Sequence, residues 1–109
     1  MMATTKNSVT SLGEQLRTLR EQAELSLRAV ATEIGIDTSL LAKIERNERQ
    51  ATKEQIKQMA LFFKVNEKQL LKEFLSDQFA YKMIEEEADL DTFKVAEAKV
   101  AYYKTKSKK

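Results

Sequence analysis

The sequence predicts an all-α fold, a bundle of five helices with an additional C-terminal helical extension. The 109 residues include no proline and two glycines, with 33% charged and 42% hydrophobic. Strands and tight turns usually bring more glycine, proline and β-branched clusters. Apolar residues also recur at three- and four-residue spacing between helix-capping signals from Ser11 to Leu75. The length suits one compact domain plus an appendage.

The composition also limits the possible functions. Cysteine and histidine are absent, which removes disulfides, Cys/His metal sites, thiol nucleophiles and imidazole bases. The acidic residues are spread along the expected helices without a pairing signal, so we expect neither an enzyme nor a bound cofactor. No apolar run approaches the roughly 18 residues of a membrane span, and the start lacks a secretion signal. We therefore expect a cytoplasmic protein.

The chain begins with a polar segment and a well-marked first helix. Residues 1–10 lack periodicity, so we expect a flexible N-terminal arm. Ser11 and Glu14 form the Ser-x-x-Glu pattern of a capping box, which starts the first helix. Leucines at helical spacing give this helix an apolar stripe, and we expect it to run to about Ala23.

Two short helices follow, separated by a tight turn. Ser26 is the expected N-cap of the first, and Gly35 ends it because glycine readily takes the left-handed conformation found there. Asp37 is the expected N-cap of the next helix. That helix should end near Asn47, since asparagine tolerates the left-handed conformation better than other non-glycine residues.

Two more helices complete the expected bundle. Thr52 and Gln55 form a second capping box, and Asn66 with Gln69 repeats the device. The five helices and their short connections fill residues 11–75, the size of a small independent bundle.

Residues 76–109 form the expected C-terminal helical extension. Within residues 78–84 the apolar spacing favours a helix, although the alternation of Phe79, Tyr81 and Met83 also fits a strand. This segment therefore remains open between the two structures at the level of sequence.

A last helix is expected after Asp89 or Asp91, either of which suits an N-cap. Its apolar residues recur at spacings of three, four and three, the pattern of a short coiled-coil seam. These residues are Phe93, Ala96, Val100 and Tyr103. One such helix is marginal alone in water, so it must pack on its own domain or on a partner. The final segment, KTKSKK, is expected to be a frayed basic tail.

The helix expected after Asp37 has two chemically different faces. At 100° per residue, Leu41 and Ile44 lie on one side, opposite Ser39, Lys43 and Arg46. Two short helices joined by a glycine-containing turn form a helix-turn-helix, whose second helix enters the DNA major groove. That groove is about 12 Å wide and admits one helix with such a face. The same charges also fit an ordinary solvated surface, because the net charge is only +2.

The segment LGEQLRTLREQAELSLRAVATEIGIDTSLLAKIERNER resembles the Cro/CI-like, or XRE-type, helix-turn-helix regulators. The resemblance covers about residues 11–75. It rests on the Leu-Arg-x-Leu-Arg of the first helix, the Ala-x-x-x-Gly of the turn and the closing Ile-Glu-Arg. It implies a lambda-repressor-like bundle and a regulator that binds double-stranded DNA.

The resemblance also implies roles for individual residues. Positions that read base edges fall on Thr38, Ser39, Leu40 and Lys43. Positions that contact phosphates fall on Ser26, Arg28, Arg46 and Arg49. A structural ion pair between Arg20 and Glu45 is implied as well. Leu27 stands where many members carry glutamine, and Arg28 is the candidate replacement for that contact. Leu40 also fits the edge of the core.

Two kinds of function remain open. The first is a sequence-specific transcriptional regulator, a repressor or controller that acts as a homodimer on a palindromic operator. One helix reads few base pairs, so two half-sites separated by about 34 Å, or by a multiple of it, are expected. The second is a protein-interaction adaptor or antitoxin-like partner of a neighbour-encoded enzyme, with DNA binding secondary. Residues 76–109 are the candidate surface for dimerisation or for that partner.

Overall fold

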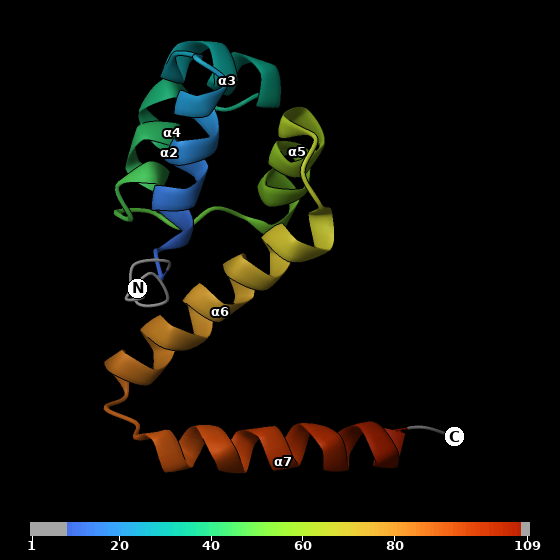
Figure 1. Cartoon of the computed structure of the whole chain (residues 1–109). Coiled ribbons are helices and arrows are strands. Elements are labelled where there is room, and N and C mark those ends of the chain that lie inside the picture. The colour runs from blue at the N-terminus through green and yellow to red at the C-terminus, as the bar shows by residue number, and fades with distance from the viewer. Residues whose placement is uncertain (1–8, 108–109) are drawn as a thin grey trace, which may run out of the picture. The chain divides into compact units, whose positions relative to one another are not determined.

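The computed structural model of the chain describes residues 9–107. These residues form α-helices joined by short connections and contain no strand (Figure 1). The helices are α2 (Leu12–Gln22), α3 (Leu27–Ile34), α4 (Thr38–Glu45), α5 (Lys53–Phe63), α6 (Glu67–Glu85) and α7 (Leu90–Ser107). The all-α prediction is confirmed, and residues 78–84 are helical. The expected arm at 1–10 lies outside the described residues except for Val9 and Thr10.

Most helices begin where the capping signals place them. Two of the three expected capping boxes form completely, at the starts of α2 and α5. At the third, the side chain of Asn66 accepts a hydrogen bond from the backbone N–H of Gln69 at 2.8 Å. Ser26 caps α3, since its hydroxyl accepts a hydrogen bond from the backbone N–H of Ala29 at 3.0 Å. Asp37 occupies the N-cap position of α4, but its side chain makes no capping hydrogen bond within the described part of the chain. That bond was expected from the sequence and is missing.

Several helices are followed by a residue in the left-handed conformation. Gly35 ends α3 with φ of 76°, and Asn47 follows α4 with φ of 64°, both as expected. Glu24, Lys64 and Glu87 adopt the same conformation with φ of 56–59°. These side chains carry a Cβ that glycine lacks, so the three positions are mildly strained.

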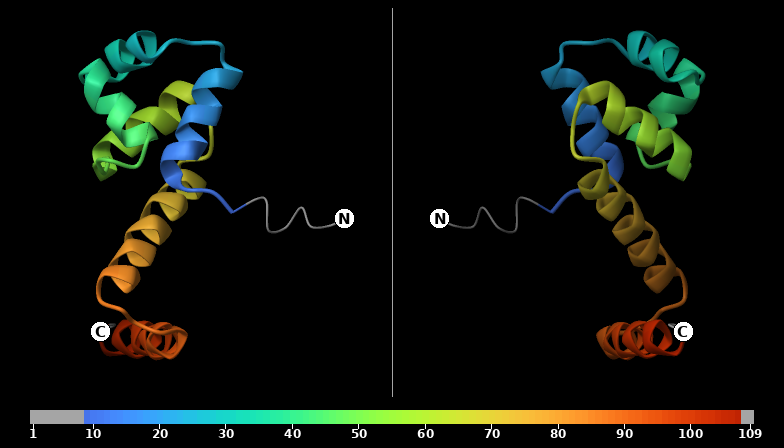
Figure 2. Two further views of the ribbon diagram at one scale, coloured as in Figure 1. Left: turned by 90° about the vertical axis from the view of Figure 1, so that its left-hand side faces the viewer. Right: turned by 90° about the vertical axis from the view of Figure 1, so that its right-hand side faces the viewer.

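The hydrophobic core lies in a first compact unit, which ends at Asp77. In this unit α2 packs on α4, and α3 packs on both α4 and α5 (Figure 2). The core side chains are Leu12, Leu16, Val30, Ala31, Ile34, Leu41, Ile44, Ala51, Ile56, Met59, Ala60, Leu70 and Phe74. A second unit begins at Gln78, and none of its residues from 78 to 106 is buried.

The C-terminal helices differ in extent from the sequence prediction. The fifth helix of the expected bundle continues without a break to Glu85. α7 begins after Asp89, whose carboxylate accepts hydrogen bonds from the backbone N–H and the hydroxyl of Thr92, both at 3.0 Å. α7 also continues through Ser107, so fraying from Lys104 onward is not what the described residues show. Lysines in a last turn favour the helix, because they interact well with its dipole.

Candidate nucleic-acid interface

A tight turn joins α3 to α4. The backbone N–H of Ile36 donates to the carbonyl of Ala31 at 3.0 Å, and Gly35 takes the left-handed conformation that this bond requires. Ala31 is 1% exposed, and its small side chain lies in the core beside the turn. The two helices therefore form a helix-turn-helix in which α4 is the second helix.

The two faces of α4 follow its helical periodicity. Leu41 and Ile44 are buried, with 1% and 2% of their surface exposed. The opposite face exposes Ser39, Lys43 and Arg46. The expected division of this helix into a core face and a polar face is therefore present.

The residues predicted to read base edges differ in how exposed they are to solvent. Thr38, Ser39 and Lys43 are exposed. Leu40 is half-buried and packs against the hydrophobic core. This contact agrees with the alternative that Leu40 lies at the edge of the core, whereas its contact with a base stays a prediction.

The start of α3 brings together two of the predicted phosphate contacts. Ser26 and Arg28 are both exposed there, and the first turn of α3 contains no acidic residue. Backbone N–H groups at a helix N-terminus attract anions. Leu27, between the two, is half-buried and packs against the core, so it does not take the polar role of the glutamine it replaces.

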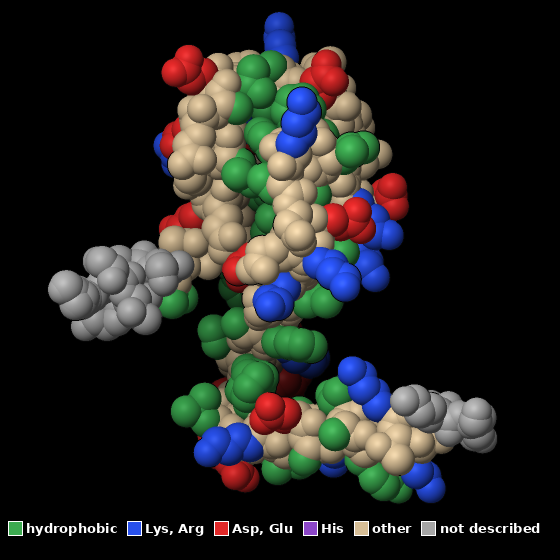
Figure 3. All heavy atoms as spheres, turned by 45° about the vertical axis from the view of Figure 1, so that its right-hand side comes forward, with side chains coloured by type: hydrophobic (Ala, Val, Ile, Leu, Met, Phe, Trp, Pro, Cys, Tyr) green, Lys and Arg blue, Asp and Glu red, His purple; other side chains and the backbone are tan. Residues whose placement is uncertain are grey.

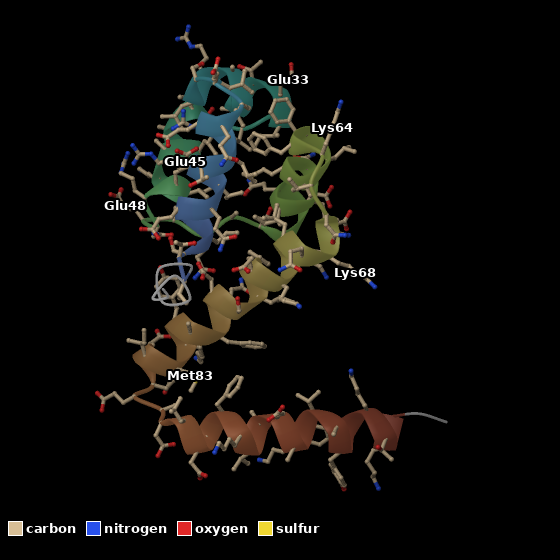
Figure 4. All side chains as sticks on the ribbon, in the orientation of Figure 1. Glu33, Glu45, Glu48, Lys64, Lys68 and Met83 are labelled. Atoms are coloured by element: carbon tan, nitrogen blue, oxygen red, sulfur yellow. The ribbon has the colours of Figure 1, made fainter. Side chains whose placement is uncertain are left out.

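Arg46 is paired with a residue that the sequence analysis missed. Its guanidinium donates to both carboxylate oxygens of Glu48, from Nε at 2.9 Å and from NH2 at 3.0 Å. These hydrogen bonds raise the pKa of Arg46 and lower the pKa of Glu48. Figure 4 shows Glu48 at the surface. A DNA phosphate must therefore compete with this carboxylate for Arg46. The spacing of two residues is not a helical pairing pattern, so the sequence carried little signal for it.

A buried ion pair fixes the end of α4 to α2. Arg20 donates to Glu45 from Nε at 2.8 Å and from NH2 at 2.9 Å, and to the carbonyl of Leu25 from NH1 at 2.9 Å. The Glu45 side chain is 5% exposed, and its hydrogen bonds raise the pKa of Arg20. Figure 4 shows Glu45 within the bundle. The pair implied by the family resemblance is therefore present.

Two further contacts hold the same end of α4. Gly13 lies against it so closely that a Cβ there would be 2.7 Å from the carbonyl oxygen of Glu45, and closer still to that of Ile44. The amide of Asn47 donates to the hydroxyl of Ser11 at 2.9 Å. The role of Gly13 was missed, because a glycine inside a helix gives no sign of which neighbour approaches it.

Neither a metal site nor a membrane-spanning helix is found in the part of the chain that the structure describes. Residues 9–107 contain no group of three or more His, Cys, Asp or Glu side chains arranged for a metal ion. Among them, no helix has both the length and the apolar character needed to cross a membrane.

Comparisons with known proteins agree with this architecture. The sequence model of a protein family, the helix-turn-helix domain, matches residues 11–72, more than half of the chain. A search of curated proteins finds no match. One similar solved structure is the restriction-modification controller protein C.AhdI from Aeromonas hydrophila. It is 29% identical, with a TM-score of 0.51 over 54% of this chain and 89% of that one. The chain belongs to the helix-turn-helix domain family and resembles its Cro/CI-like, or XRE-type, DNA-binding regulators.

Proposed function

We propose that this protein is a sequence-specific, double-stranded DNA-binding transcriptional regulator, a repressor or controller that acts as a cytoplasmic homodimer on a palindromic operator. Residues 11–75 are the DNA-binding domain of this proposal, and residues 76–109 are its dimerisation or partner-binding extension. The observation that carries it is the polar face of α4, which exposes Ser39, Lys43 and Arg46 while the opposite face is buried. The protein binds DNA without catalysing a reaction on it.

The proposed contacts divide into two kinds. Lys43 donates to the O6 and N7 acceptors of a guanine, and Thr38 and Ser39 bond a base edge or a phosphate. Leu40 contacts a thymine methyl. The phosphate contacts are Ser26, Arg28, Arg46 and Arg49. Such contacts position the protein on the duplex, whereas base contacts determine the sequence it prefers.

The similarity to C.AhdI supports the proposed role as a controller, since that protein is a restriction-modification controller. The matched part covers 89% of the C.AhdI chain, so the similarity extends over most of that controller protein. A two-fold arrangement is proposed because one α4 reads only a few base pairs, and two copies read both halves of a palindrome.

The salt dependence of DNA binding tests the proposal. Three arginines per copy make about six phosphate contacts in a dimer, so log K should fall against log salt with a slope of about −5. The measurement is a titration of labelled duplex by fluorescence anisotropy at several salt concentrations. Weak binding with a flat salt dependence would contradict the proposal.

Single substitutions separate the two kinds of contact. Lys43→Ala should cost about 1–3 kcal/mol on the preferred site and relax the choice of base. Arg49→Ala should weaken binding to all sequences alike and flatten the salt slope by about 1 per contact. Lys68→Ala is the control, because Lys68 is exposed at the start of α6, away from α4 (Figure 4). If Lys43→Ala and Arg49→Ala behave identically, the division of roles is wrong.

A second candidate function is the adaptor or antitoxin-like partner of a neighbour-encoded enzyme. One observation favours it, namely the large apolar side chains exposed on the second unit. In this case the enzyme covers those side chains, and binding to DNA is weak and insensitive to salt. The same titration therefore separates the two functions.

A further inference from the structure

The described residues of the second unit form no hydrophobic core, since none from 78 to 106 is buried. Every residue from Leu90 to Lys106 is exposed, and the large apolar residues of α7 expose between 46% and 77% of their surface. Figure 3 shows hydrophobic side chains at the surface of α7 and of the end of α6. A single helix of this length is marginal in water, and clustered apolar exposure marks an interaction surface. Another surface must cover these side chains.

An apolar groove of about 440 Å³ lies within this unit. One wall is the end of α6, with Phe79 and Met83, and the other is one face of α7. Met83 is marked in Figure 4 near the end of α6. The apolar residues of the α7 wall are Phe93, Ala96 and Val100, and Thr92 and Glu97 complete it. These three apolar residues are three of the four residues of the coiled-coil seam that the sequence predicts.

The spacing of the seam is the same when it is read from either end. The intervals from Phe93 through Ala96 and Val100 to Tyr103 are three, four and three residues. A second α7 laid antiparallel therefore places Phe93 opposite Tyr103 of the partner subunit. It also places the small Ala96 opposite Val100 of the partner subunit. Alternating large and small layers of this kind pack well.

The charges of the second unit also favour an antiparallel pair, because the acidic end of one copy would lie beside the basic end of the other. Residues 85–91 contain five acidic side chains and no basic one, and residues 98–109 contain five lysines and no acidic one. The two ends of α7 are about 27 Å apart, well beyond the Debye length of about 8 Å, so they attract each other little within one chain. On α7 itself, Asp91 in the first turn and Lys104 and Lys106 in the last turn each suit the helix dipole. An antiparallel partner adds the attraction of opposite charges, whereas a parallel one adds repulsion.

The nearly balanced charge of residues 78–109 favours a second copy over a strongly charged partner. Seven basic and six acidic residues leave a net charge of +1 (7 − 6).

We infer that the groove binds α7 of a second copy of this chain, with the two α7 helices antiparallel about a two-fold axis near residue 98. Each copy contributes the same surface, which is the usual form of a two-fold interface. The inference rests on the proposed function, because it names the surface that makes the proposed dimer.

Sedimentation equilibrium of the full chain, without DNA, tests this inference. The chain should sediment as a dimer, at twice the 12.5 kDa of one chain. Val100→Glu places a charge in the groove and should weaken the dimer at least about 100-fold. Val95→Glu is the matched control, since Val95 is an exposed valine of α7 outside the groove, and this variant should remain a dimer. A monomeric wild-type chain, or equal effects of the two variants, would overturn the inference.

Cysteine cross-linking tests the antiparallel register, because the chain has no cysteine of its own. In the inferred dimer, two copies of position 93 are about 15 Å apart, beyond the roughly 7 Å reach of a disulfide. Phe93→Cys alone should therefore remain uncross-linked. Mixing it with Tyr103→Cys should give a disulfide between the two variants. A disulfide in Phe93→Cys alone indicates a parallel pair and overturns the inference.

Failure of the dimer and failure of DNA binding are distinguishable. The masses are measured without DNA, and binding to a selected duplex is measured separately with Val100→Glu and Val95→Glu. A monomeric wild-type chain that binds DNA specifically overturns this inference and leaves the DNA-binding proposal in place. An antiparallel dimer that prefers no DNA sequence supports this interface and contradicts the proposed regulator.

Discussion

Arg20 of α2 and Glu45 of α4 form a buried, bidentate ion pair, with hydrogen bonds of 2.8 and 2.9 Å. The carboxylate lies on the final residue of the helix whose polar face is proposed to meet DNA. The pair therefore holds the end of α4 against the first helix of the bundle. In the proposed complex with DNA, buried residues that contact no base therefore hold the helix that reads the bases.

Loss of this carboxylate should be strongly destabilising. Glu45→Ala leaves the guanidinium of Arg20 largely buried without its partner, and we expect a loss of about 3 kcal/mol in the free energy of unfolding. Urea denaturation monitored by circular dichroism measures it. Glu21→Ala is the control, since the Arg17–Glu21 pair is exposed and should contribute less than about 1 kcal/mol. Similar losses for the two variants would contradict a structural role for the buried pair.

Alanine and asparagine should destabilise the protein in opposite order at the two glycines. A Cβ at Gly13 meets the carbonyls at the end of α4, so Gly13→Ala should cost about 1–3 kcal/mol and Gly13→Asn more. A Cβ at Gly35 meets nothing within 4 Å, but its φ is 76°. Gly35→Ala should therefore cost about 1 kcal/mol, and Gly35→Asn less, because asparagine tolerates this conformation. Thermal unfolding measures the four variants. If the alanine variant is the more stable of the two at both positions, or the asparagine variant is at both, then close contact at Gly13 and positive φ at Gly35 are not separate causes.

Glu48 should weaken DNA binding by holding Arg46. Glu48→Gln removes the carboxylate that competes with a phosphate, so affinity for all duplexes should rise by about twofold to fivefold at low salt. Anisotropy titrations on a specific and a scrambled duplex measure this effect. Glu21→Gln removes a carboxylate from the exposed pair on α2 and serves as the control. An unchanged affinity for Glu48→Gln would mean that Arg46 does not contact a phosphate.

The start of α7 should be sensitive to acid. Hydrogen bonds from the backbone and side chain of Thr92 lower the pKa of Asp89, so its capping stabilises the helix above the ordinary carboxyl pKa. That stabilisation is lost as the pH falls through the lowered pKa. Asp89→Asn keeps a capping oxygen that does not titrate. Wild type should thus be more helical than Asp89→Asn at neutral pH, and the difference should shrink in acid.

The control for this titration is Asp91→Asn, which removes a carboxylate from the same turn but leaves the cap in place. Circular dichroism at 222 nm measures the helicity of all three proteins. If the difference between wild type and Asp89→Asn stays constant with pH, the charge of Asp89 does not stabilise α7.

The starts and ends of the helices were largely predictable, because the residues that cap a helix lie next to its ends in the sequence. Ser11 and Thr52 begin α2 and α5 through capping boxes, and Gly35 ends α3. These devices depend on residues within one turn of helix, which a sequence displays directly. The two faces of α4 followed from periodicity for the same reason.

The contacts that position α4 were less predictable, because they join residues far apart in the chain. Only family resemblance pointed to Arg20 with Glu45, and nothing pointed to the close approach at Gly13. The carboxylate of Asp77 is a further example, since it accepts a hydrogen bond from the backbone N–H of Leu12 at 2.9 Å. It stabilises the start of α2 from 65 residues away.

The most direct test of the central claim is selection of duplexes from a random pool at near-physiological salt, followed by sequencing of those retained. We predict a palindromic consensus whose half-sites are spaced by about one helical turn of DNA, read by Lys43 and its neighbours on α4. The consensus should lose definition with Lys43→Ala. If the retained duplexes do not differ from the input pool, sequence-specific DNA binding by this protein is contradicted.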